Sequence, residues 1–324
     1  MTKFLPVMGV LLAGAAVPLA AQPTMTQEYE AVSQPETVDS TTQAIDVRFK
    51  RDEFDRMTVP VRVGGSGPYR FLIDTGADRT AISSVIARHL NLRDRKDVIL
   101  HSVTGISSVE TAKVPMLDLT AKTMRNIDAA LLEPEHMGAD GILGLDSLRS
   151  QRVLFDFKNQ TLTVVPAETR VKDDKDTIVV TAHVRNGRLI LAQARAEGIP
   201  VTLVIDTGAQ VSIGNEALLR RLNRGSVKRT GPIELHSVTG KTLTGQYTIV
   251  KEMTVAEITL KQLPVVFADS HAFRRLGLDK KPALLLGMNA LRGFDKVSID
   301  FYRKKLKVVL PEESSLQLRA LALR

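Results

Sequence analysis

The chain has no cysteine and no tryptophan, and aromatic residues make up only 4% of its 324 positions. Without cysteine, disulfides and thiolate chemistry are excluded. With few aromatics, the chain offers little on which nucleic-acid bases could stack. The formal net charge is +8, but the basic residues fall in scattered groups. This distribution favours a solvated surface over a nucleic-acid groove, with attraction to an anionic envelope surface or an acidic substrate as a weaker alternative.

Two common hydrolase signatures are also missing. The sequence contains neither Gly-x-Ser-x-Gly nor His-Glu-x-x-His, so a serine hydrolase and a zinc peptidase lack support. His101 and His236 could suggest a metal site, but their neighbours supply no ligand spacing. We therefore expect these histidines to make structural hydrogen bonds, and we expect no metal or other cofactor.

The N-terminus has the features of an export signal. Lys3 precedes an apolar run at residues 4–20, and small residues follow at the end of that run. This pattern predicts a signal peptide at residues 1–21 and a periplasmic or secreted protein. An uncleaved membrane anchor is the alternative, and Pro6 and Pro18 in so short a run make it less favourable.

The rest of the chain contains a long internal repeat. Asp74-Thr-Gly-Ala77 returns as Asp206-Thr-Gly-Ala209, an offset of 132 (206 minus 74). His101-Ser-Val-Thr-Gly105 returns as His236-Ser-Val-Thr-Gly240, and residues 141–149 return as residues 284–292. The order is kept while the offset grows to 143 (284 minus 141), as small loop insertions would produce. The sequence therefore predicts a duplicated domain.

The repeat gives a domain plan for the whole chain. A polar tether at residues 22–44 leads into a first lobe at residues 45–166. A charged linker at residues 167–176 separates it from a second lobe at residues 177–311, and residues 312–324 form a tail. Short runs of β-branched residues between Gly and Pro predict strands through both lobes.

Two aspartates on matching turns are the main candidates for chemistry. If the two halves pack about a pseudo-twofold axis, Asp74 and Asp206 would face each other, and two such carboxyls cannot both ionise easily. One could then take a proton from a water held between them while the other protonates the carbonyl under attack. Thr75 and Thr207 could hydrogen-bond across the pair, and Gly76 and Gly208 bring backbone N–H groups close.

These motifs resemble those of retropepsin-like aspartic proteases of the bacterial exported kind, with two units fused in one chain. The resemblance covers residues 45–166 and 177–311. It implies an all-β, bilobal acid-protease fold with β-barrel lobes and short helices, and hydrolysis of an extended peptide by Asp74 and Asp206. It also implies that residues 142–144 and 285–287 pack under the catalytic loops. A single chain would already form an internal pseudo-dimer, so we expect a monomer.

The resemblance also suggests substrate-binding residues. These lie beside the aspartates and at two flap tips: Ala77, Asp78, Ala209, Gln210, Val103, Thr104, Gly105, Val238, Thr239 and Gly240. In viral enzymes an Arg follows the lower Gly and pairs with the residue equivalent to Asp78, but here Leu145 and Met288 stand in that position. Ala77 and Ala209 follow the retroviral pattern, which predicts activity extending above strongly acid pH.

Two functional alternatives remain at the level of sequence. The chain could be an active endopeptidase, or an exported peptide-binding module that kept the cleft and lost turnover. A third possibility concerns the substrate, which could be the chain's own tether at residues 22–44.

Overall fold

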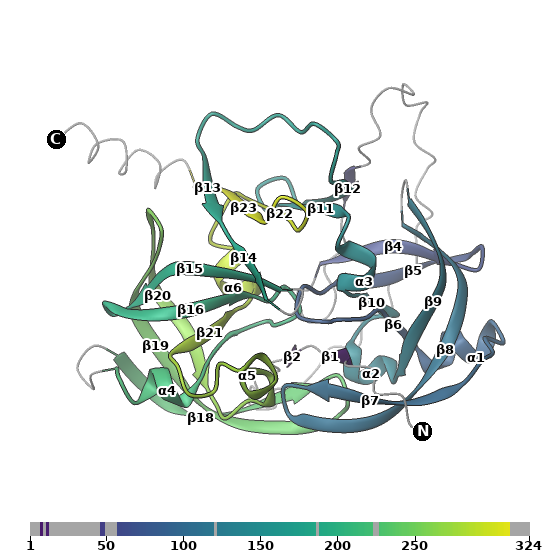
Figure 1. The fold of residues 1–324 in the computed structure, drawn as a ribbon, viewed down its shortest axis with the longest axis horizontal. Helices are drawn as coiled ribbons and strands as arrows, with labels where there is room; N and C mark the ends of the chain where they lie inside the picture. The colour runs from purple at the N-terminus through teal and green to yellow at the C-terminus, as the bar shows by residue number, and fades with distance from the viewer. Residues whose placement is uncertain are drawn as a thin grey trace, which may run out of the picture.

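The computed structural model describes residues 7–8, 11–12, 46–48, 57–119, 122–185, 188–222 and 227–311. The tether and the tail predicted from the sequence lie outside the described residues, as does most of the predicted signal peptide. Within the described residues, strands dominate and the helices have six residues or fewer. Two lobes lie side by side in Figure 1, the first in purple and blue and the second in green.

The first lobe is built on an eight-stranded sheet in the order β1-β7-β8-β4-β5-β10-β6-β9, which is curved so that β8 also pairs with β9. Its sequence alternates as a half-buried strand should: Val59, Val61 and Val63 of β4 are buried, whereas Pro60 and Arg62 are exposed. The strands are β1 (Val7–Met8), β4 (Thr58–Val63), β5 (Ser66–Ile73), β6 (Ala81–Ser83), β7 (Lys96–Ser102), β8 (Gly105–Leu119), β9 (Lys122–Leu132) and β10 (Gly141–Leu143).

The second lobe repeats this arrangement in a nine-stranded sheet. The order is β14-β15-β16-β21-β17-β20-β19-β18-β2, and β15 also pairs with β19. The strands are β2 (Leu11–Leu12), β14 (His183–Arg185), β15 (Arg188–Ala196), β16 (Ile199–Ile205), β17 (Ser212–Gly214), β18 (Val227–Ser237), β19 (Thr242–Val255), β20 (Ile258–Phe267) and β21 (Ala283–Leu286). The parallel pair β16–β21 corresponds to β5–β10 of the first lobe.

A third sheet joins the lobes and lies across the top of Figure 1. Its order is β13-β23-β22-β11-β12-β3, and the antiparallel contact between β11 and β22 crosses from one repeat to the other. The strands are β3 (Asp46–Arg48), β11 (Gln151–Asp156), β12 (Thr161–Pro166), β13 (Thr177–Thr181), β22 (Lys296–Asp300) and β23 (Lys305–Val309). The largest hydrophobic cluster runs from both lobes into this sheet.

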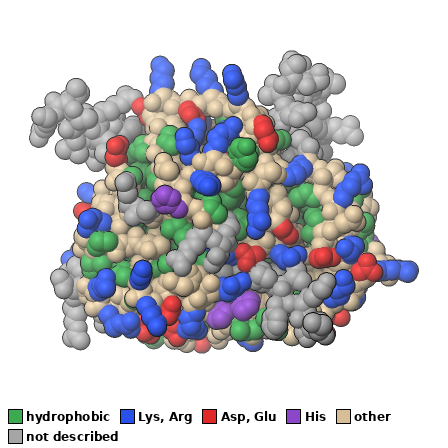
Figure 2. All heavy atoms as spheres, in the orientation of Figure 1, with side chains coloured by type: hydrophobic (Ala, Val, Ile, Leu, Met, Phe, Trp, Pro, Cys, Tyr) green, Lys and Arg blue, Asp and Glu red, His purple; other side chains and the backbone are tan. Residues whose placement is uncertain are grey.

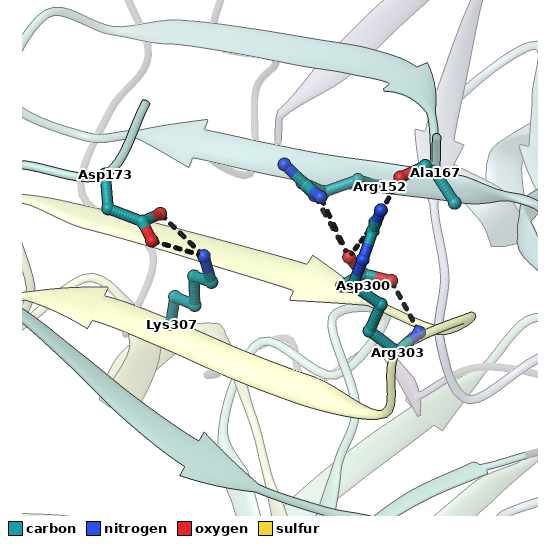
Figure 3. Close-up of polar contacts among 6 residues, drawn as sticks. All are labelled: Arg152, Ala167, Asp173, Asp300, Arg303 and Lys307. Carbon is teal, nitrogen blue, oxygen red and sulfur yellow. Dashed lines mark hydrogen bonds and ion pairs between the residues drawn. The ribbon is translucent and has the colours of Figure 1, made fainter. Parts of the chain in front are cut away.

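Polar contacts also tie this sheet together (Figure 3). The guanidinium of Arg152 on β11 donates to Asp300 on β22 at 3.0 and 3.1 Å, and both side chains are buried. Arg303 donates to Asp300 and to the backbone carbonyl of Ala167, and Lys307 pairs with Asp173 at 2.6 Å. Residues 167 and 173 belong to the charged segment that connects the two repeats, so this segment is fastened to the shared sheet.

Short helices close the ends of both lobes. They are α1 (Ser84–His89), α2 (Pro134–Met137), α3 (Leu145–Leu148), α4 (Glu216–Leu219), α5 (His271–Leu276) and α6 (Met288–Leu291). Ser83 and Asn215 cap α1 and α4 through their side chains, as their sequence positions predict. On α1, Ser84, Ile86 and Ala87 are buried, whereas Val85 is exposed. None of these described helices is long and apolar enough to cross a bilayer.

The predicted fold class is confirmed: the protein is all-β and bilobal, with two barrel-like lobes and short helices. On the face shown in Figure 2, Lys and Arg side chains are spread over both lobes with Asp and Glu between them. They do not gather into one basic patch on this face.

Candidate active site

Asp74 and Asp206 stand at equivalent places in the two lobes, immediately after β5 and β16. The backbone N–H of Asp74 donates to the carbonyl of Leu143 at 3.0 Å, and that of Asp206 donates to the carbonyl of Leu286 at 3.0 Å. Each aspartate is thereby held by the strand that runs parallel to its own. This placement follows from the repeated apolar runs, which form the central buried strands of each lobe.

Thr75 and Thr207 join the two loops across the lobe boundary. The Thr75 hydroxyl donates to the carbonyl of Ile205 at 2.9 Å, and the Thr207 hydroxyl donates to the carbonyl of Ile73 at 2.8 Å. Each hydroxyl also accepts the backbone N–H of the opposite threonine at 3.1 Å. These four reciprocal bonds bring the loops together about a pseudo-twofold axis. The hydroxyls bond to the opposite backbone and not to the carboxylates themselves.

The two glycines after the threonines allow close approach to the carboxylates. The N–H of Gly76 donates to Asp74 Oδ1 at 2.7 Å, and the N–H of Gly208 donates to Asp206 Oδ1 at 3.1 Å. A Cβ on Gly76 would lie 2.5 Å from Asp206 Oδ1. Only glycine therefore leaves room for Asp206 beside the loop of the opposite lobe.

Both carboxyls of the aspartate pair are buried. Asp74 is 0% exposed and Asp206 is 3% exposed. Burial, followed by the charge of Asp206, raises the pKa of Asp74 well above its ordinary value. Burial also raises the pKa of Asp206, while the cation of Arg188 opposes the rise. Asp74 Oδ2 is buried and has no hydrogen-bond partner among the described residues.

The segments at residues 142–144 and 285–287, with the residue that follows each, hold the two Asp-Thr-Gly loops in place. The N–H of Leu145 donates to the carbonyl of Ala77, and the N–H of Met288 donates to the carbonyl of Ala209, both at 2.8 Å. A Cβ on Gly144 would lie 2.4 Å from the backbone carbon of Arg79, so this position has no space for a side chain. The side chains of Ala77 and Ala209 are buried at this contact.

A polar residue stands two positions after Gly144 and after Gly287. In each lobe it anchors the start of the short strand that follows the Asp-Thr-Gly loop. Asp146 accepts the N–H of Thr80 at 3.0 Å and its hydroxyl at 2.8 Å. In the second lobe Asn289 accepts the N–H and the hydroxyl of Ser212, both at 2.8 Å. The two lobes thus use a carboxylate and an amide for the same local role.

Asp78 is paired with an arginine that the sequence analysis missed. Arg188 Nη1, from the start of β15 in the opposite lobe, lies 2.8 Å from Asp78 Oδ1, and the same guanidinium donates to the carbonyl of Gly76. The Arg188 side chain is only 2% exposed. Leu145, which stands where viral enzymes have the arginine, is buried apolar core. The internal repeat could have pointed to Arg188, because Arg56 occupies the equivalent position in the first copy, at the same offset of 132 (188 minus 56).

Gln210, the counterpart of Asp78, has a different environment. Its backbone carbonyl accepts the N–H of Asn289 at 3.0 Å, and its side chain is half-buried. An amide cannot form the ion pair that Asp78 makes with Arg188. The two sides of the dyad therefore differ in charge although their backbones match.

The two His-Ser-Val-Thr-Gly segments are the tips of long hairpins, β7–β8 and β18–β19, which run along the bottom of Figure 1. Each tip valine crosses to the opposite lobe: Val103 packs with residues of the second lobe and Val238 with residues of the first. Both are 1% exposed. Each hairpin belongs to one lobe while its tip docks on the other. We call β7–β8 the first flap and β18–β19 the second flap, after the flap tips expected from the sequence.

The flap tips also bond to each other. The hydroxyl of Thr104 donates to Ser237 Oγ at 3.1 Å. Ser102 bonds to Thr104 at 2.8 Å, and Ser237 bonds to Thr239 at 2.7 Å. This row of four hydroxyls explains why Ser and Thr recur at both tips. Gly105 and Gly240 each have a positive φ, of 140° and 75°, as tight turns require.

The backbone of two short N-terminal strands lies between the flaps. β1 pairs in parallel with β7, with Val7 opposite Leu100, and β2 pairs antiparallel with β18, with Leu12 opposite His236. In Figure 1 both strands lie between the lobes. The space between the flap strands therefore accepts an extended chain that adds to both sheets.

Metal ligands do not gather anywhere in the described ranges. No group of three or more His, Asp or Glu side chains there has the geometry to hold a metal ion. His101 lies 2.8 Å from His271, and His236 is exposed.

Comparison with known families agrees with this geometry. Residues 59–150 match the family model described as gag-polyprotein putative aspartyl protease. Residues 192–290 match the model described as aspartyl protease. The first match contains Asp74 and the second contains Asp206. No curated protein matches the chain. With two such domains in tandem and two lobes that meet at matching Asp-Thr-Gly loops, the chain belongs to the retropepsin-like aspartyl proteases and carries two fused units.

Proposed function

We propose that the protein is an aspartic endopeptidase that hydrolyses extended peptides with a water activated between Asp74 and Asp206. The observation that carries the proposal is the meeting of the two Asp-Thr-Gly loops, fixed by four reciprocal threonine bonds. Burial raises the pKa of both carboxyls, so one of them can keep its proton at a pH where an exposed aspartate is ionised. Two aspartates on an exposed surface would be neither held in one geometry nor removed from water.

The two carboxyls take different roles in this mechanism. Asp74 keeps its proton to higher pH, because burial and the charge of Asp206 both raise its pKa. Asp206, in the ionised form, accepts a proton from the water while the water oxygen bonds to the carbonyl carbon of the peptide. Asp74 gives its proton to the carbonyl oxygen, which forms a tetrahedral diol. The C–N bond then breaks as the proton on Asp206 passes to the leaving nitrogen, and Asp74 recovers a proton from the diol.

The substrate in this proposal is a peptide in extended conformation. The pairing of β1 and β2 with the flap strands supports it, since a peptide backbone could form the same hydrogen bonds. Asp78, held by Arg188, and Gln210 would flank the bound chain on its two sides. The bound peptide would be covered by the two flap tips, which consist of Val103, Thr104, Gly105, Val238, Thr239 and Gly240.

The test is cleavage of a mixed peptide library by residues 22–324 between pH 3 and 8. Wild-type protein should cleave, and Asp74→Asn and Asp206→Asn should lose at least a factor of about 10³ in kcat while they still bind peptide. Activity should extend well above pH 3, because the pKa of both carboxyls is raised. Binding without cleavage by folded wild-type protein would instead favour a peptide-binding module of the same fold.

We also propose that the protein is exported, on the evidence of Lys3 and the apolar run at residues 4–20. The N-terminus of the mature protein, determined by sequencing after expression with its leader, should begin near residue 22. Export is refuted if the leader stays uncleaved and the protein remains in the cytoplasm. Further shortening within residues 22–44 that depends on Asp74 would identify the tether as a substrate of the same chain.

A further inference from the structure

The first flap is fastened to the second lobe at Val103, the valine at its tip. The carbonyl of Val103 accepts the backbone N–H of His271 and the hydroxyl of Ser270, both at 3.0 Å. Ser270 caps α5, so the flap tip is bound at the first turn of that helix. Beside it, His101 Nδ1 lies 2.8 Å from His271 Nε2.

This histidine pair joins the two lobes directly. His101 is on β7 of the first lobe and His271 begins α5 of the second. Their rings are nearly coplanar, with an interplanar angle of 10° and centroids 5.1 Å apart. The bond needs one N–H donor and one nitrogen lone pair, so at least one ring must be neutral. If both rings carry a proton on each nitrogen, no acceptor remains and two cations face each other.

The charged groups around the pair disfavour protonation. Burial lowers the pKa of His101, and Arg275 adds to this effect, while Asp78 opposes it. Burial lowers the pKa of His271, and His101, Arg274 and Arg275 act in the same direction. Both histidines therefore bind protons more weakly in the closed arrangement than when exposed to solvent. Acidification must then favour the arrangement in which the pair is separated.

The repeat supplies a natural comparison. His236 is the counterpart of His101 on the second flap, and its side chain is exposed. The opposite helix on that side, α2, places His136 beside Gly240 at the tip, where a Cβ on the glycine would lie 2.5 Å from the His136 ring. In the part of the chain that the structure describes, the first flap alone therefore has a histidine that bonds to a histidine of the opposite lobe.

We propose that His101 and His271 are positioning residues that form a pH-dependent latch, which holds the first flap closed at neutral pH and releases it on acidification. A substrate peptide has to pass under this flap to reach the dyad, so the inference rests on the proposed function for its role in catalysis. The opening itself does not depend on hydrolysis. At acid pH the flap exchanges between docked and free positions, and entry to the cleft becomes faster.

The experiment measures the flap position by electron paramagnetic resonance. Because the chain has no cysteine, spin labels can be placed on Ser108→Cys of the flap and Lys280→Cys of the second lobe, both exposed positions. Residues 22–324 with wild-type histidines should show one short distance at pH 7.5 and a second, longer distance at pH 5. His271→Ala keeps the backbone N–H that bonds to Val103, and it should show the longer distance at both pH values. His101→Gln should behave in the same way.

The matched control is His236→Ala, which should follow the wild-type protein at every pH. Circular dichroism on each labelled sample identifies a variant that has unfolded, and His101→Gln then provides the test if His271→Ala does not fold. A wild-type distance that does not change between pH 7.5 and 5 refutes the latch, as does equal behaviour of the His236 and His271 variants. Opening without peptide cleavage by wild-type protein supports the latch and refutes the proposed hydrolysis. Peptide cleavage by wild-type protein whose flap distance does not change with pH supports the proposed hydrolysis and refutes the latch.

Discussion

The bonds made by Thr75 and Thr207 give the most direct prediction about how the lobes are held together. We expect Thr75→Val to destabilise the protein strongly and Thr75→Ser to have little effect. Valine keeps the shape of threonine but removes the hydroxyl. It leaves the carbonyl of Ile205 without its 2.9 Å donor and the N–H of Thr207 without its 3.1 Å acceptor.

The size of the effect follows from the burial of these groups. Thr75 is 2% exposed and Thr207 is 7% exposed, so water cannot replace the lost partners without opening the lobe boundary. A buried polar group left without a partner costs about 1–3 kcal/mol, and two such groups give about 2–6 kcal/mol. Serine keeps both bonds and loses one methyl group, which costs about 1 kcal/mol. Whole domains have only about 5–15 kcal/mol of stability, so the valine variant should be severely affected.

The measurement is urea unfolding at neutral pH of residues 22–324, with an Asp206→Asn background to prevent self-digestion in all samples. Thr207→Val should match Thr75→Val, because the two residues make reciprocal bonds. The double variant should cost less than the sum of the two single changes, since the groups are in contact. If Thr75→Val is no less stable than Thr75→Ser, the hydroxyls do not hold the lobes together in solution.

Three further predictions concern the charges and glycines around the site. Arg188→Met should move both limbs of the pH–rate profile to higher pH, because the Arg188 cation lowers the pKa of Asp74 and Asp206; Arg195→Met on the same strand is exposed and should leave the profile in place. Asp300→Asn should lower the free energy of unfolding, measured in urea, by about 3–5 kcal/mol, because it leaves the charge of buried Arg152 uncompensated. As a control, Asp295→Asn should lower it by less than about 1 kcal/mol, because its partner Lys158 is 52% exposed and lies 3.8 Å away. Gly144→Ala should destabilise by about 1–3 kcal/mol, because its Cβ would lie 2.4 Å from Arg79; equal loss in Gly293→Ala, where the nearest atom is 3.2 Å away, would contradict this account.

The sequence was sufficient for the fold class because the strand pattern is local, the repeat is visible when the chain is compared with itself, and the motifs resemble those of a known family. The apolar runs before Asp74 and Asp206 predict buried strands, and the matching order of segments predicts two similar lobes. The shared sheet is harder to foresee. Its central contact pairs Val153 with Ile299, and nothing in either strand alone indicates that partner. Strand pairing across the lobes depends on tertiary packing, which periodicity does not encode.

Two features of the site show where sequence reasoning stops. The place of Asp78 beside the dyad follows from the Asp-Thr-Gly motif, but its partner Arg188 is 110 residues away and belongs to the other lobe. The histidine of the first flap could be expected to make a structural bond, and it does so with His271. That partner lies in α5, outside every segment that the repeat aligns clearly, so spacing gives no signal for it.

The duplication suggests why the two carboxyls can be assigned different roles. In a symmetric dimer every charge near one aspartate has a copy near the other, so the carboxyls are equivalent until substrate binds. Here the hydrogen bonds that need symmetry are kept, namely the four threonine bonds and the paired strand contacts. The charged neighbours have diverged: Asp78 pairs with Arg188 whereas Gln210 cannot, and Asp146 corresponds to Asn289. Fusion lets one side change without the other, so the charged surroundings of Asp74 and Asp206 differ before any substrate enters.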